Sequence, residues 1–375
     1  MHWILAALVT GSAVFCALVI VAARRYLAGS PPSPRATPPL SVLKPLAGAD
    51  EGLEDNLRSF FEQTYRGEFE LLFAVREESD PAAAVARALI GRYPAVPARL
   101  LIVGEPPYAN AKVWSLERMT AEARYPLLAM SDSDIRVTPS FLATVAAEFA
   151  ADPALGVSTC PYRAVPGAGF WSTLEAVMMN TEFLSGILVA RMLEGMKFAV
   201  GPTVVARKDA IERIGGWARL KDYLAEDFML GQLAADNGIG VGLSRYVIEH
   251  RIGSQPFAAN ARHRLRWCRS TRRSRPAGYL GQIFTNPLPL ALLLWIAQPS
   301  WWPLSAAAMA VRAWAAVEVA GRVLRDPLCA GRWWLVPLAD AASFLFWLGG
   351  FFGNTIAWRG RTYFLHSDGR FERIA

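Results

Sequence analysis

Cysteine is scarce in this sequence, and its cysteines stand far apart. Cys16, Cys160, Cys268 and Cys329 are the 4 cysteines among 375 residues. Their spacing excludes a Cys-x-x-Cys redox pair and a metal knuckle, and it implies no disulfide framework. We therefore expect the soluble part of the protein to face a reducing cytosol.

Charged residues are also few, at 19% of the chain, whereas hydrophobic residues make up 53%. This composition is too apolar for an ordinary soluble protein, yet it leaves room for a sizeable soluble domain, so we expect part of the chain in a membrane. The net charge of +7 would suit nucleic acid. The arginines, however, cluster beside apolar segments, where the positive-inside rule and anionic lipids account for them. We expect membrane lipids, and no nucleic acid, as partners.

The first apolar segment lies at the amino terminus. Residues 3–23 form an uncharged run of about 21 residues, the length that crosses the hydrocarbon core of a bilayer, and Arg24 and Arg25 follow it. A cleaved signal peptide carries its charge before the apolar core, so residues 1–25 are predicted as an uncleaved anchor with the amino terminus outside. Residues 26–39 are rich in proline and serine and are predicted as an extended linker.

Residues 40–258 alternate strand and helix patterns, which predicts an α/β domain. Such repeats form a mostly parallel sheet that is covered on both faces and binds ligands at the carboxyl ends of its strands. The predicted strands are 40–43, 71–75, 100–103 and 126–130, and the predicted helices are 53–63, 82–93 and 112–123.

Acidic residues follow two of these strands. Glu77 and Asp80 come after the second strand, and Asp132 and Asp134 end the fourth. Alternate residues of a strand face the same way, so Asp132 and Asp134 can both reach one divalent cation, which could hold the diphosphate of a nucleotide sugar. Carboxylates at strand ends are also common in ordinary solvated loops, and the pattern alone leaves both interpretations open.

Two further polar segments lie later in the chain. Glu226 and Asp227 open an apolar helical pattern, where they could cap the helix or supply a catalytic base. Residues 259–277 are rich in arginine and are predicted as a basic helix at the membrane surface.

The order of these segments resembles the family 2 inverting glycosyltransferases with the Rossmann-like GT-A fold, in their ceramide glucosyltransferase-like branch. The likeness is greatest to the bacterial glycosyltransferases of hopanoid biosynthesis, and it covers about residues 40–289 and, weakly, 358–363. It implies an enzyme of the bacterial inner membrane with a cytoplasmic catalytic domain. The stretches that carry it are 44–48 (KPLAG), 110–112 (NAK), 132–137 (DSDIRV), 226–227 (ED) and 263–267 (HRLRW).

The resemblance implies roles for the acidic residues. Glu77 and Asp80 would contact the uracil and ribose of a UDP-sugar, although the family usually has Asp where Glu77 stands. Asp132 and Asp134 would hold Mg²⁺ or Mn²⁺ against the diphosphate. Asp227 would be the base that takes the proton of the acceptor hydroxyl, and displacement with one base would invert the anomeric centre.

Three more residues are assigned to the donor site by the resemblance. Lys112, Arg266 and Trp267 match the family pattern, and Lys112 and Arg266 would stabilise the charge of the departing UDP. His263 departs from the pattern, because Gln or Arg usually stands at its position.

The apolar segments suggest the acceptor and the membrane arrangement. Residues 170–200 are either plain core or the groove for a lipid alcohol. The resemblance implies a hopanoid polyol or a ceramide as this acceptor, with UDP-N-acetylglucosamine or UDP-glucose as donor. Three apolar segments of spanning length are predicted within 278–358, at 278–298, 301–321 and 333–358. Counting spans puts the tail, 359–375, outside. Asp340 weakens the last span, however, which leaves a re-entrant last segment as the alternative. Four arginines argue for a cytosolic tail: Arg359, Arg361, Arg370 and Arg373.

Two other functional classes share parts of this pattern. A processive polysaccharide synthase would share the D-x-D and the Arg-Trp motif but needs several more spans. A membrane scaffold without activity would explain the apolar segments and leave the order of the acidic motifs unexplained.

Overall fold

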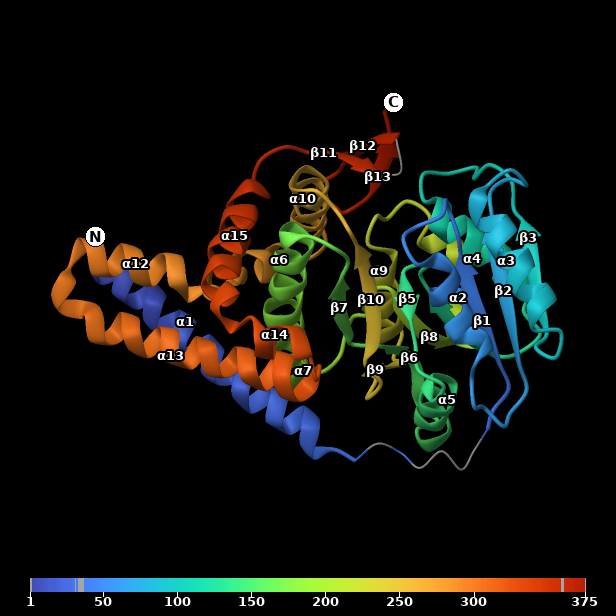
Figure 1. The fold of residues 1–375 in the computed structure, drawn as a ribbon, viewed down its shortest axis with the longest axis horizontal. Coiled ribbons are helices and arrows are strands. Elements are labelled where there is room, and N and C mark those ends of the chain that lie inside the picture. The colour runs from blue at the N-terminus through green and yellow to red at the C-terminus, as the bar shows by residue number, and fades with distance from the viewer. Residues whose placement is uncertain (1, 31, 33–36, 359–360, 375) are drawn as a thin grey trace.

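The computed structural model describes residues 2–30, 32, 37–358 and 361–374 (Figure 1). Arg359, and residues 31 and 33–36 of the predicted linker, lie outside the described residues. An α/β domain occupies one end of the molecule and a bundle of apolar helices the other (Figure 1). The two meet along helices α6 (Phe170–Met178), α10 (Phe257–Ser274) and α15 (Val336–Gly349).

The α/β domain is built on a seven-stranded sheet in the order β3-β2-β1-β4-β8-β6-β9. All neighbours are parallel except at β8, which runs antiparallel to β4 and β6. The predicted α/β fold with a mostly parallel sheet is confirmed. The strands are β1 (Leu40–Pro45), β2 (Phe69–Val75), β3 (Ala98–Ile102), β4 (Leu127–Ser131), β6 (Leu155–Thr159), β8 (Thr203–Arg207) and β9 (Gly240–Leu243).

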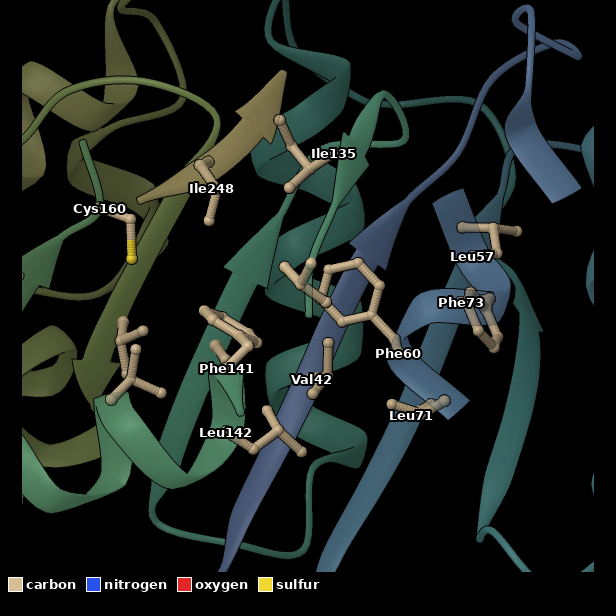
Figure 2. Close-up of a cluster of buried hydrophobic side chains, with 14 of the residues drawn as sticks. Val42, Leu57, Phe60, Leu71, Phe73, Ile135, Phe141, Leu142, Cys160 and Ile248 are labelled. Carbon is tan, nitrogen blue, oxygen red and sulfur yellow. The ribbon is translucent and has the colours of Figure 1, made fainter. Parts of the chain in front are cut away.

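Helices cover both faces of this sheet, so its central strands, such as β1, β2 and β4, are buried on both sides. In β1, Val42 packs with Phe60 and Phe141 on one face, whereas its neighbour Leu43 packs with Met119 on the other. Figure 2 shows the first of these clusters over β1 and β2. Two-sided burial explains why the strands read as continuous apolar runs. The covering helices are α2 (Leu53–Phe61), α3 (Pro81–Arg92), α4 (Ala111–Glu122), α5 (Phe141–Ala151), α8 (Lys208–Arg213) and α9 (Glu226–Asp236).

A second, three-stranded sheet stands beside the carboxyl end of β4. It has the order β5-β10-β7, with β5 (Ile135–Arg136), β10 (Ile248–Gly253) and β7 (Tyr162–Pro166). The antiparallel pairing of β10 with β5 sets His250 opposite Ile135. This sheet therefore fixes the turn that carries Asp132 and Asp134.

The apolar bundle consists of α1 (His2–Ala28), α12 (Pro287–Ala297) and α13 (Trp302–Ala316). Val9, Leu294 and Ala308 are buried between the three helices. At the end far from the α/β domain, Trp3 lies edge-on to Trp301, with their ring centroids 5.0 Å apart. The protein is a membrane protein by these helices: residues 2–28 and 299–323 have the length and apolarity of a span, and the pair 276–284 and 287–297 has them together across a 52° bend.

A third helical segment of spanning length, Phe170–Glu194, has a different position. It comprises α6 (Phe170–Met178), a π-helical turn at Met179–Phe183, and α7 (Leu184–Glu194). The strands on either side of it, β7 and β8, both belong to the α/β domain. A single membrane crossing would separate those strands, so this segment lies along the border between the domain and the bundle.

The last apolar segment, residues 333–358, for which the sequence left a span and a re-entrant segment open, is not one continuous helix. A short 3-10 turn at Trp333–Leu335 leads into α15 (Val336–Gly349), which is too short to span, and the chain then enters strand β11 (Thr355–Trp358). Hydropathy alone does not separate a helix that packs on a membrane protein from one that crosses the bilayer. In α15 the buried Asp340 pairs with Arg312 of α13 at 2.6 Å.

The tail forms a small antiparallel sheet of β11, β12 (Arg361–Leu365) and β13 (Phe371–Arg373). It packs on the α/β domain: the Phe371 amide donates to the Asp222 carbonyl at 2.8 Å, and Leu224 is buried against Ile356 and Tyr363. The sequence left two positions for the tail open. This contact favours the one on the same side as the α/β domain.

Candidate active site

The two aspartates of the D-x-D lie in the turn that joins β4 to β5. The Asp132 amide donates to the Pro202 carbonyl at 2.8 Å, and the Asp134 carbonyl accepts from the Arg251 amide at 2.8 Å. Each side chain is 33% exposed, so both remain accessible to a ligand. The predicted position at the carboxyl end of the fourth strand is therefore the one observed.

Lys112 connects the D-x-D to the start of α9. Its ammonium lies 2.8 Å from Asp132 Oδ1 and 2.9 Å from Glu226 Oε1. Asn110 caps the helix that carries it, because the Asn110 side chain accepts from the Lys112 and Val113 amides. Burial alone would lower the pKa of Lys112, but the two carboxylates outweigh burial and raise it. Lys112 is therefore a fixed cation between Asp132 and Glu226.

Asp227 stands in the first turn of α9, next to this ion pair. Its Oδ2 accepts from the Gly201 amide and its Oδ1 accepts from the Phe228 amide at 2.8 Å. Burial, together with the charge of Glu226, raises the pKa of Asp227 to about 6. A carboxylate with this pKa is ionised at neutral pH and is a stronger base than an ordinary aspartate. A cavity of about 20 Å³, enough for about one water molecule, is lined by Lys112, Gly201, Glu226 and Asp227 among others.

Gly201 is a residue that sequence analysis did not single out. Its φ of +79° is in the left-handed region, and an added Cβ would stand 3.0 Å from the ring of Tyr162. A side chain at position 201 would therefore disturb the Gly201 amide, which donates to Asp227.

His250 was also missed. Its Nε2 lies 3.1 Å from Asp134 Oδ2, and the imidazole is buried. This pair overrides the effect of burial and lowers the pKa of Asp134 to about 2. No local signal marks His250, because the pairing of β10 with β5 brings it to the site.

Lys44, in the stretch 44–48 of the resemblance, contacts the backbone of Asp132. Its side chain is fully buried over the Phe60 ring, and its ammonium donates to the Asp132 carbonyl and to Ser131 Oγ. Burial lowers the pKa of Lys44 to about 7. Lys44 therefore holds the backbone of the D-x-D.

The first acidic motif is one strand away from the D-x-D, since β1 stands between β2 and β4. Asp80 caps α3 by accepting from the Ala82 amide at 2.9 Å, and it also accepts from the Gly48 amide at 2.9 Å. Glu77 is exposed. The two carboxylates thus differ, because Asp80 holds two loops together and Glu77 faces the solvent.

The Arg-Trp motif lies on α10 (Phe257–Ser274), within the predicted basic segment. The Trp267 ring packs 4.5 Å from His263 and 6.0 Å from Phe183, by ring centroids. Burial, together with the nearby charge of Arg266, lowers the pKa of His263 to about 3, so His263 is neutral. Arg264, which was not predicted as a site residue, is buried in an ion pair with Glu175 of α6 at 2.8 Å.

The donor atoms at the D-x-D fit a divalent cation. Asp132 and Asp134 offer hard carboxylate oxygens, and Asp134 Oδ1 is buried with no hydrogen-bond partner among the residues that the structure describes. Within the same residues, no group of three or more His, Cys, Asp or Glu side chains is placed to hold a metal. A cation here would therefore need further oxygen ligands from a diphosphate or from water.

The comparisons with known proteins agree on one class. Residues 3–371 match the family model described as Glycosyl transferase family 21. Two curated relatives from Caenorhabditis elegans are ceramide glucosyltransferase 1, 33% identical over 56% of this chain and 44% of its own length, and ceramide glucosyltransferase 3, 28% identical over 56% and 45%. The chain therefore spans less than half the length of these relatives.

A solved structure supports the fold. The mannosyltransferase PcManGT from Pyrobaculum calidifontis, in complex with GDP-Man and Mn²⁺, aligns with 92% of this chain and 99% of its own at 18% identity and a TM-score of 0.53. The expected ceramide glucosyltransferase-like branch is confirmed by the relatives, whereas the greater likeness to hopanoid-specific members stays a prediction. By its sequence over nearly its whole length, the chain belongs to glycosyl transferase family 21.

Proposed function

We propose that this protein transfers a sugar from a UDP-sugar to a hydroxyl group of a membrane lipid, with inversion at the anomeric carbon. One observation carries the proposal: Asp227, with its pKa raised to about 6, shares a cavity with Lys112 and Glu226, and Lys112 in turn contacts Asp132. A base and a diphosphate-binding motif are thus joined through one lysine. The family and its ceramide glucosyltransferase members support the same reaction.

Asp227 is the proposed general base. A lipid hydroxyl has a pKa far above neutral, so its proton must leave as the new glycosidic bond forms. The Gly201 and Phe228 amides fix the Asp227 carboxylate, which accepts that proton on the face opposite the departing UDP. Displacement from the opposite face inverts the anomeric carbon, so an α-linked donor gives a β-glycoside.

Asp132 and Asp134 are the proposed ligands of Mg²⁺ or Mn²⁺, in keeping with the Mn²⁺ in the mannosyltransferase complex. When bound, the cation would neutralise charge on the diphosphate as it leaves. Lys112 supplies positive charge beside Asp132, and Arg266 is the proposed second cation at the diphosphate. Trp267 positions this part of α10 by packing on His263 and Phe183.

Glu77 is the proposed contact to the uracil and ribose of the donor. Asp80 already accepts from two backbone amides, whereas Glu77 is exposed at the same strand end. Asp80 would then act by holding the loop around Gly48 in place. The predicted pair of donor residues is thus proposed to divide into one contact and one support.

The lipid acceptor is proposed to approach along the border segment Phe170–Glu194. Two of its apolar side chains, Trp171 and Leu193, remain 43% and 62% exposed. The names of the relatives favour ceramide and glucose, and the sequence resemblance favours a hopanoid polyol, so both acceptors belong in the test. We also propose that the α/β domain lies on the cytoplasmic side.

The test is transfer by the purified full chain in detergent. UDP-glucose and UDP-N-acetylglucosamine are each offered with ceramide or with a hopanoid polyol, in the presence of Mg²⁺ or Mn²⁺, and labelled product is extracted into organic solvent. We expect label in the organic phase with one acceptor, and none with the Asp227→Asn variant. Label that stays in the aqueous phase as a polymer would instead favour the polysaccharide synthase. Absence of both transfer and UDP release with every donor would contradict the proposal.

A further inference from the structure

A polar hollow lies on the molecule away from the candidate active site. It has a volume of about 560 Å³ and is formed where the end of α1 meets α7, α5 and β9. The residues that matter here are Arg25 of α1, Arg191 of α7 and Arg245, which follows β9. No residue of its lining contributes to the cavity beside Asp227.

Two of the three arginines of the hollow lie over one aromatic ring. The guanidinium carbons of Arg245 and Arg191 lie 4.4 Å and 5.7 Å from the centroid of Tyr26. Tyr26 is itself buried, and its hydroxyl donates to the Ser244 carbonyl at 2.6 Å. Two guanidinium groups of like charge therefore lie near the same ring and repel each other. An anion bound between them would relieve this repulsion.

The protein supplies little negative charge to balance this site. Among the described residues, no ion pair joins Arg25, Arg191 or Arg245 to a carboxylate. Glu148 lines the hollow, but its oxygens accept from the Arg245 amide and from the hydroxyls of Ser244 and Ser158. Asp152 also lines it, so three arginines face two carboxylates, and the hollow retains positive charge.

The position of the hollow indicates where its ligand comes from. Arg25 lies in the last turn of the apolar helix α1, and Ala22, one turn earlier, also lines the hollow. Met192 and Met196, which flank the end of α7, add apolar lining. A site with an apolar wall at the end of a spanning helix lies at the depth of lipid headgroups, where arginine pairs with phosphate.

We propose that this hollow binds an anionic phosphoryl group through Arg25, Arg191 and Arg245. The group is either the headgroup phosphate of an anionic membrane lipid or a free phosphate, and the apolar wall favours the lipid. Bound there, it would join α1 to α7 and so anchor the α/β domain to the bundle at a point away from the reaction.

The test is thermal unfolding of the full chain in a nonionic detergent, with three additions: dioleoyl phosphatidylglycerol, dioleoyl phosphatidylcholine or inorganic phosphate. We expect phosphatidylglycerol to raise Tm by at least about 3 °C, because a ligand of the folded state stabilises it. A rise with phosphatidylglycerol alone identifies the lipid source, and an equal rise with inorganic phosphate shows that a free phosphate suffices. Either rise should disappear in the Arg191→Gln/Arg245→Gln variant.

The control variant is Arg66→Gln/Arg213→Gln, which removes the same charge from exposed positions of the α/β domain and should keep the full rise. If the loss of the Tyr26 stacking unfolds the first variant, Arg25→Gln/Arg191→Gln leaves Arg245 on the ring and replaces it. An equal rise with phosphatidylcholine, the same rise in the arginine variants as in the original chain, or no rise with any addition would each overturn the proposal.

Discussion

Asp227 is the residue whose environment is most specific to a chemical role, because two backbone amides hold a carboxylate that burial makes more basic. Asp227→Asn keeps the shape but cannot accept a proton. We expect at least about 10²-fold loss in kcat with donor affinity nearly unchanged. Turnover and UDP-sugar binding are measured separately, and a variant with near-normal kcat would remove Asp227 from the mechanism.

The same residue predicts a pH dependence. Burial raises the pKa of Asp227 to about 6, so the basic form that the reaction needs is present above this pH and is lost as pH falls through it. We expect kcat/KM to fall about tenfold per pH unit below about pH 6, measured between about pH 4 and pH 8. A profile that stays flat down to about pH 4, the usual range of an aspartate, would contradict the assignment.

Replacing Glu77 and replacing Asp80 are expected to change different properties, the donor KM and the stability respectively. Asp80→Ala removes the cap of α3, so it should lower the free energy of unfolding by about 0.5–2 kcal/mol. Glu77→Ala should leave stability unchanged and raise the donor KM with a smaller effect on kcat. Thermal unfolding and donor kinetics of both variants are compared. If only Asp80→Ala raises the donor KM, with no loss of stability, the two roles are reversed.

At the residue scale, the sequence could predict the site wherever the signal is local. Asp132 and Asp134 end an apolar strand, and Asp227 opens a helix, so the chain itself marks them. His250 and Gly201 reach the site through pairings of distant strands and loops, and nothing in the adjacent sequence marks that contact.

At the scale of elements, the packing of α15 on the bundle depends on a buried ion pair. Arg312 and Asp340 are 3% and 1% exposed, and Arg312 also donates to the Thr181 carbonyl. Arg312→Met should lower the free energy of unfolding by about 3–5 kcal/mol, because it leaves Asp340 buried without a partner. The double variant Arg312→Met/Asp340→Leu should recover much of this loss. If it is as unstable as the single variant, the charge on Asp340 is not what destabilises the single one.

Elements that depend on a partner far away in the sequence were not predictable from the local sequence. The first four strands read clearly because each is a continuous apolar run between turns. A strand such as β5, with two residues, exists only because β10 pairs with it. Helix α15 is apolar enough to suggest part of a span, and the pairing of Asp340 with Arg312 on another helix, which lets it pack on the bundle, is not visible in the local sequence.

For the whole molecule, the docking of the tail on the α/β domain predicts the membrane arrangement. Residue 300, in the turn between α12 and α13, should lie on the opposite side of the membrane from residue 367, between β12 and β13. Ser300→Cys and Ser367→Cys are labelled with a membrane-impermeant maleimide in vesicles of both orientations. Glu78→Cys, exposed on the α/β domain, is the control and should label with Ser367→Cys. Labelling of positions 300 and 367 from the same side would contradict this arrangement.

The contact between β13 and the loop before Asp227 also has a consequence for the time course of synthesis. The Asp222 carbonyl accepts from the Phe371 amide, and Phe371 is synthesised 149 residues after Asp222. At synthesis rates of about 5–20 residues per second, that interval is on the order of ten seconds. The apolar helices α12, α13 and α15 are made within it, whereas α1 is made before it. The contact of β13 with the loop beside the proposed base therefore forms only after the last helix of the bundle has been made.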